Sequence, residues 1–156
     1  MDEALRGYLV ADAGISALVG DRIAWALRPR SDALPSIALH LISGVRDYHM
    51  EGASGLVESR VQVDCWATTI LAALTIARAV NAAIGGLHAV IDGVQFQAVM
   101  LESQSTRAED NPMSPDDVLY RVMQDYMIWH TEDISFEVLN EAIVGAGGGD
   151  VLGAGG

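Results

Sequence analysis

The sequence predicts an α+β protein in which a mostly antiparallel β-sheet is packed by two main helices and carries a long projecting β-hairpin. Apolar and polar residues alternate from residue 57 to 65, a period of two that is typical of a half-buried strand. Residues 70–84 place their apolar side chains at helical spacing instead. A glycine-containing turn at residues 52–55 separates two strand-like runs, which favours a hairpin.

Length and composition predict one globular domain. The 156 residues match the usual domain size of about 100 to 150, and 51% are hydrophobic while 19% are charged. Nine arginines and no lysine stand against 21 acidic residues, so the net charge is 9 − 21 = −12. Because this charge repels phosphate backbones, the composition disfavours a conventional nucleic-acid binder.

The N-terminal part predicts one helix and one short strand. Residues 2–18 have near-helical apolar spacing, two acids favourable to the N-terminal dipole, and Gly20 as a stop. Gly14 inside this segment predicts a break into two short pieces. Residues 22–27 follow as a short strand, and residues 28–32 as a loop.

The predicted projecting hairpin pairs residues 36–50 with the alternating strand at 57–65. Its inner part is apolar, whereas its outer part mixes charged and aromatic groups and is expected to project. The candidate partner contacts there are Arg46, Tyr48, His49 and Met50. Aromatic, Met and Arg side chains are enriched at interfaces. The alternative interpretation is that these side chains pack locally against their own hairpin.

A second helix is predicted at residues 70–84. Thr68 and Thr69 can cap its start, and Gly85 with Gly86 ends the pattern. A second hairpin follows, in which an Asp-Gly turn joins residues 87–91 to residues 94–101.

Residues 104–117 show no periodicity and predict a long polar loop before a last strand at residues 118–129. Loops of this length often contact partners, which makes Arg107 and Met113 candidate contacts.

The composition changes after residue 130. Residues 131–156 hold seven of the 16 glycines, five acids and no base. We therefore divide the chain into a domain at 1–130 and an acidic, Gly-rich extension at 131–156. Within the extension, Ile134, Phe136 and Val138 alternate with polar residues and are candidates for strand addition to a neighbouring molecule.

No motif in the sequence predicts catalysis, a metal site or a cofactor. Cys65 lies on the apolar side of a strand, and the four histidines lack metal-site spacing. Two alternatives stay open: a small-molecule-binding α+β module with an apolar pocket between the second helix and the sheet, and an acid–base enzyme using Asp64 or His40.

The sequence predicts neither export nor a membrane span. The N-terminal residues lack the basic and apolar regions of a signal peptide. The apolar stretches at 65–77 and 79–91 are shorter than the roughly 20 residues that a membrane helix needs.

Four segments, taken in order, carry a family resemblance: residues 9–23, 34–37, 60–67 and 120–129. Together they resemble the tail-completion or tail-terminator proteins of long-tailed bacteriophages and related gene transfer agents. The resemblance implies an α+β subunit without catalytic activity or cofactor. It also implies a hexameric ring at the head-proximal end of the tail, within the virion, after assembly in the host cytoplasm.

In such proteins the ring stops polymerisation of the major tail tube protein and offers its other surface to the head-tail connector protein. Genome DNA then passes through the centre without specific binding. Acidic residues lining the channel would keep DNA from adhering, although a merely solubilising role explains the surplus more simply.

Overall fold

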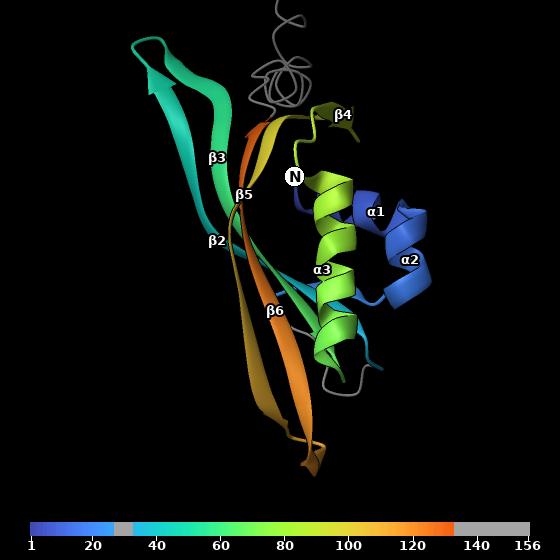
Figure 1. Cartoon of the computed structure of the whole chain (residues 1–156). Coiled ribbons are helices and arrows are strands. Elements are labelled where there is room, and N and C mark those ends of the chain that lie inside the picture. Colours follow the sequence, from blue (N-terminus) through green and yellow to red (C-terminus); the bar gives the residue numbers. More distant parts are fainter. Residues whose placement is uncertain (27–32, 133–156) are drawn as a thin grey trace, which may run out of the picture.

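A computed structural model describes residues 1–26 and 33–132 (Figure 1). Within these residues the chain forms three helices and six strands, which confirms the α+β class. The elements are α1 (Asp2–Ala11), α2 (Ala13–Val19), β1 (Ile23–Trp25), β2 (Ser36–His49), β3 (Gly52–Ala67), α3 (Ile70–Ile84), β4 (Ala89–Ile91), β5 (Val94–Asn111) and β6 (Ser114–Thr131). The contact candidates Ile134, Phe136 and Val138, and the predicted loop at 28–32, lie outside the described residues.

The six described strands form one sheet in the order β1-β2-β3-β6-β5-β4. Only β1 and β2 are parallel, and every other neighbouring pair is antiparallel. Four strands, β2, β3, β5 and β6, are much longer than β1 and β4, so the ends of the long strands extend beyond the packed centre (Figure 1). The three helices lie on one side of the sheet.

The first predicted helix is two helices, and its break differs from the predicted position. The chain leaves helical geometry at Asp12, whose side chain accepts a hydrogen bond from the Ile15 amide at 3.0 Å and so caps α2. Gly14, the predicted break, lies inside α2. A capping carboxylate therefore ended α1 before the glycine could, while Gly20 ends α2 as predicted.

The core lies between the helices and one face of the sheet. The strand predicted from alternation is confirmed, since Val61, Val63 and Cys65 are fully buried beneath the helices. The helix at 70–84 is confirmed with the predicted bounds, and Thr69 accepts a hydrogen bond from the Ala72 amide at its start. Five of its residues are buried and fill the space against the sheet: Ala73, Ile76, Ala77, Val80 and Ile84.

The predicted polar loop at 104–117 is wrong, because these residues form a second long hairpin. Pairing between β5 and β6 continues from Arg107 opposite Arg121 to Asp110 opposite Val118, and Asn111 caps the turn by accepting from the Met113 amide at 3.0 Å. Backbone hydrogen bonds hold these strands with both faces partly in solvent. An apolar alternation, the signal used to predict strands, is therefore not needed there.

Register shifts interrupt two strands at one level of the sheet. One lies between Leu41 and Ser43 of β2, and another between Leu101 and Ser103 of β5. The pairings connect Leu41 to Leu101 across the sheet through Val61 and Tyr126. Beyond this level, β2 and β5 extend away from the packed part of the sheet in opposite directions.

Among the described residues, none of the helices has the length and apolar character required to cross a membrane.

Candidate assembly surfaces

Two pairs of strands extend from the core in opposite directions, and we name them by their strands (Figure 1). The β2–β3 arm comprises residues 41–58, and the β5–β6 arm comprises residues 102–121. Neither arm is covered by a helix. In both arms, backbone hydrogen bonds between the paired strands hold the chain in place, and many side chains remain exposed to solvent.

The β2–β3 arm exposes an unusual amount of apolar surface. Every residue from 41 to 50 is exposed, and the pairing with β3 continues to His49 opposite Gly52. Tyr48 is 67% exposed and Val45 is 62% exposed, and Met50 stands free at the end. The structure therefore brings Tyr48, His49 and Met50 together at one tip, where their binding to a partner stays a prediction.

Arg46 is held at the root of this arm rather than displayed at its tip. Its Nε donates to Glu132 Oε2 at 2.7 Å and its Nη2 donates to Oε1 at 2.6 Å. These bonds hold the pKa of Glu132 below its usual value. The Glu132 amide also donates to the Gly55 carbonyl at 2.7 Å, so the end of β6 is fastened to the arm. Arg46 is thus bound to the chain that follows β6 rather than to its own hairpin, and its role in partner binding stays a prediction.

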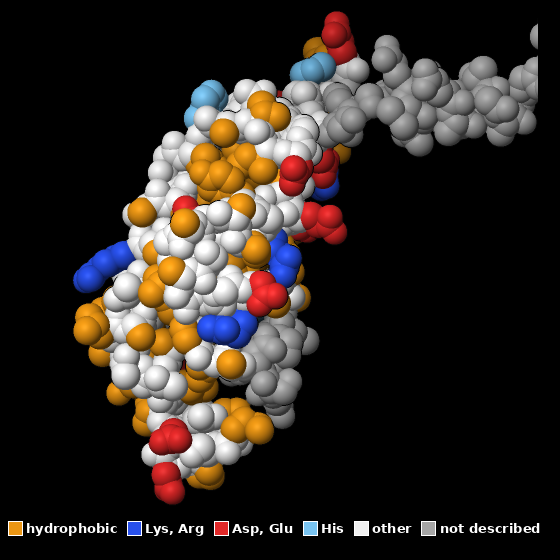
Figure 2. Space-filling view, turned by 90° about the vertical axis from the view of Figure 1, so that its right-hand side faces the viewer, with side chains coloured by type: hydrophobic (Ala, Val, Ile, Leu, Met, Phe, Trp, Pro, Cys, Tyr) orange, Lys and Arg blue, Asp and Glu red, His pale blue; other side chains and the backbone are white. Residues whose placement is uncertain are grey.

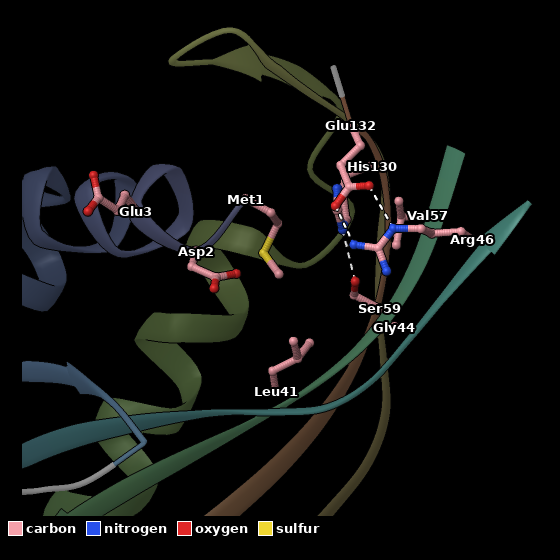
Figure 3. Close-up of a pocket in the computed structure, with 10 residues that line it drawn as sticks. All are labelled: Met1, Asp2, Glu3, Leu41, Gly44, Arg46, Val57, Ser59, His130 and Glu132. Atoms are coloured by element: carbon pink, nitrogen blue, oxygen red, sulfur yellow. Dashed lines mark hydrogen bonds and ion pairs between the residues drawn. The ribbon is translucent and has the colours of Figure 1, made fainter. Parts of the chain in front are cut away.

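A cavity of about 440 Å³ separates the root of the β2–β3 arm from the start of α1 (Figure 3). The Arg46–Glu132 pair lies on one side of it, and Met1 and Asp2 lie across from that pair. On its wall, Ser59 Oγ and His130 Nε2 are 2.8 Å apart. His130 is 3% exposed, and burial lowers its pKa, which favours the neutral ring.

The β5–β6 arm displays charge more than apolar surface. Arg107 and Met113 are exposed, as are Asp116 and Asp117 near the turn. Viewed from the helix side, acidic side chains stand at the free end of this arm (Figure 2). The structure places both contact candidates of this arm in a hairpin, Arg107 within β5 and Met113 in the turn. Their binding role stays a prediction.

A second cavity of about 390 Å³ runs along the β5–β6 arm, from His40 and Asp64 at its root to Pro112 at its turn. His40 Nε2 is 3.2 Å from Asp64 Oδ2, and the Asp64 side chain is only 3% exposed. Gln62 donates to the other carboxylate oxygen at 2.8 Å. Arg121 crosses the cavity wall, with its guanidinium 5.1 Å from the Trp66 ring centre and 3.4 Å from Glu109.

The structure brings together the two residues of the acid–base alternative, His40 and Asp64. The described residues that line this cavity include no serine, threonine or cysteine that a His–Asp pair could activate. A buried carboxylate needs a cationic or donor partner for stability alone. The geometry therefore supports a structural polar contact more directly than an acid–base site.

The small-molecule alternative expected an apolar pocket between α3 and the sheet. Buried side chains of both elements occupy that space, and the two cavities described above lie elsewhere. Cys65 belongs to this core, where burial raises the pKa of its thiol well above the usual value. Among the described residues no group of three or more His, Cys, Asp or Glu side chains could hold a metal ion.

Sequence reasoning missed the free sheet edges. β1 pairs with only three residues of β2, and β4 with only three residues of β5. Long stretches of both edge strands therefore extend past their short neighbours. The sequence did carry a signal: the strand-like segments that become β1 and β4 are much shorter than the segments that become β2 and β5.

These features define a small α+β protein with two exposed strand arms. Comparison with known proteins agrees with this class. Residues 3–131 match the family model "Tail completion protein gp17". The chain therefore belongs to the tail completion protein family, as its sequence resemblance indicated.

A solved structure supports the fold. The chain is similar to one in "Virion of native gene transfer agent (GTA) particle", with a TM-score of 0.65 and 20% sequence identity. The similarity covers 85% of this chain and 95% of that chain. No curated protein matches the sequence. Membership of the family supports a structural role in a phage tail.

Proposed function

We propose that this protein is a structural virion component that forms a ring, hexameric by the family resemblance, at the head-proximal end of the tail. The ring ends the tail tube and joins the tail to the head-side connector. The observation that carries the proposal is the match of residues 3–131 to the tail completion family. The two uncovered arms give the subunit surfaces suited to this role.

The arms supply contact area that the small core lacks. A stable standard interface buries about 1,600 Å² in total, and a ring subunit needs two such joints. The exposed apolar side chains of the β2–β3 arm, including Val45, Tyr48 and Met50, are suited to burial in such contacts. Because the arms point in opposite directions, one ring can contact the tube on one side and the connector on the other.

The charge of the chain suits a channel for DNA. At −12, the subunit lacks the surplus of cations with which proteins neutralise phosphates. Genome DNA would pass such a ring without being retained.

The proposal is tested by removing the gene and restoring it in trans. We expect tails of irregular length that do not join to filled heads, and normal particles after complementation. Averaged images of purified tails should show the protein as a ring at the upper end. Uniform tails joined to filled heads in the absence of the protein would refute the proposal.

A further inference from the structure

The free backbone edges of the sheet lie on its two opposite borders. On β2, the Ile37 amide donates to Arg22 and the Leu39 carbonyl accepts from Ala26, both toward the β1 side. Past Leu39 no described strand pairs with that side of β2, which leaves residues 41–49 as a free edge.

On the other border, β4 covers β5 only from Val94 to Phe96. Gly86 then donates to the Val99 carbonyl at 2.8 Å, and His88 contacts the Gln97 carbonyl at 2.9 Å. Past these contacts no described strand pairs with the outer side of β5, which leaves residues 101–111 as its free edge.

The two free edges begin at one level and extend in opposite directions. The pairings place Leu41 level with Leu101. From there, the β2 edge runs toward the tip of its arm and the β5 edge toward the tip of the other arm. The sheet is therefore a parallelogram, and its two free borders are offset along the strand direction.

A closed sheet with tilted strands needs an offset of this kind. When β2 of one copy pairs directly with β5 of the next, the repeating unit is the four strands β2, β3, β6 and β5, which span about 19 Å at about 4.8 Å per strand. With the strand tilt of about 40° found in closed barrels, copies at equal height are displaced along the strands by about 16 Å. At about 3.3 Å per residue this is about five residues. That displacement places residues 41–46 of β2 beside residues 103–107 of β5, and both stretches are free of any described neighbour on their outer side.

The chain direction also fits. Three successive antiparallel pairings separate β2 from β5, so β2 and β5 run antiparallel. A neighbouring copy in the same orientation thus offers β5 to β2 as an antiparallel partner, the arrangement of all the long pairings in this sheet. Charges on both edges, including Arg46 and Asp47 on β2 and Glu102 and Arg107 on β5, oppose indiscriminate pairing with other strands.

We infer that copies of this chain join edge to edge, with the free edge of β2 in one copy paired antiparallel to the free edge of β5 in the next. The result is one continuous tilted-strand sheet around the ring. The inference rests on the proposed ring and adds which elements join it and in which register. The occupant of each free edge is a second copy of this chain.

Cysteine cross-linking in the full chain tests this joint. Cys65 is fully buried, so introduced cysteines are the only accessible thiols among the described residues. The variant carries Val45→Cys and Ser105→Cys, two exposed positions whose strand partners Glu58 and Met123 share the helix-free face. With a short bis-maleimide, the protein in assembled tails should lose its monomer band and give a ladder that ends at the ring size.

Three matched variants make the result specific. Val45→Cys with Met100→Cys moves the second thiol by five residues, to the register of an untilted joint, and should give no ladder. Val45→Cys with Leu71→Cys places the second thiol on α3 and should also give none. Mixing Val45→Cys protein with Ser105→Cys protein should give dimers only, because each subunit then carries one accessible thiol and can be linked to one neighbour.

The outcomes separate this inference from the proposed function. Rings seen in images of the Val45→Cys, Ser105→Cys protein together with an intact monomer band would overturn the edge joint and leave the ring. A ladder from the Met100 variant alone would overturn the tilted register, and dimers from Val45→Cys protein alone would indicate a two-fold joint instead. Tails that lack any ring of this protein would refute the proposed function itself.

Discussion

The roots of the two arms are stabilised by different chemistry. At the β2–β3 arm, the Arg46–Glu132 pair is half exposed, and the buried contact beside it is the uncharged Ser59–His130 pair. At the β5–β6 arm, a buried carboxylate is paired with His40, and Arg121 lies against Trp66. The first root therefore combines an exposed ion pair with a buried neutral contact, whereas the second contains a buried carboxylate and a guanidinium packed on an aromatic ring.

The largest effect is expected for the His40→Leu substitution at the second root. It leaves the buried Asp64 carboxylate with only the Gln62 amide as its described partner, and we expect a loss of about 2–3 kcal/mol in the free energy of unfolding. Urea denaturation at neutral pH measures this. Adding Asp64→Asn removes the unpaired charge and should recover part of the loss. A His40→Leu protein as stable as the parent would show that the root does not depend on the contact between His40 and Asp64.

The next effect is expected for Arg121→Met. This change removes the guanidinium from the Trp66 ring and from Glu109, and should cost about 1–2 kcal/mol in the free energy of unfolding. Arg107→Met is the matched control, because Arg107 lies opposite Arg121 in the hairpin but is exposed. Equal losses in the two variants would contradict the special role assigned to Arg121.

At the first root, His130 should make stability depend on pH. Burial lowers its pKa, so the unfolded chain binds a proton more readily than the folded chain. The stabilisation is complete above the unfolded pKa of about 6.5 and is lost as pH falls toward the lower folded value. Unfolding free energies of the parent and of His130→Gln between pH 8 and 5 measure this difference. Parallel profiles for the two proteins would contradict it.

The smallest effect is expected for Arg46→Ala. Its partner Glu132 is also well exposed, so solvent screens the pair and the midpoint of thermal unfolding should change little. Glu132→Gln should behave alike, and the parent should be insensitive to added salt. A large fall in the midpoint for Arg46→Ala alone would show that the two roots resemble each other after all.

The same contrast explains which parts of the fold the sequence predicts. The apolar alternation at residues 57–65 and the helical spacing at 70–84 report burial on one side, and both elements are found where expected. The β5–β6 arm has polar residues on both faces, so its strands leave no such pattern. Ion pairs such as Arg46 with Glu132 join residues distant in sequence, and only the sheet register brings them together.

The break at Asp12 and the free edges show a further limit. A side-chain cap and a glycine both predict a helix end, and the sequence alone does not rank them two residues apart. The extent of an edge depends on how far a neighbouring strand runs. That length is set by tertiary contacts such as the one from Gly86 to Val99.

The paired register shifts carry a final consequence. Ile42 and Glu102 are the additional residues at these shifts, and each sits where an arm leaves the packed part of the sheet. Side chains alternate with a period of two, yet Leu41 and Ser43 pair with the adjacent residues Val61 and Arg60 and so face opposite sides of the sheet. Deleting Ile42 or Glu102 would therefore restore regular alternation and keep the strand pairings of the arm beyond it. The arm's side chains would face as before, and the bend and added twist that a bulge gives to its strand would be lost.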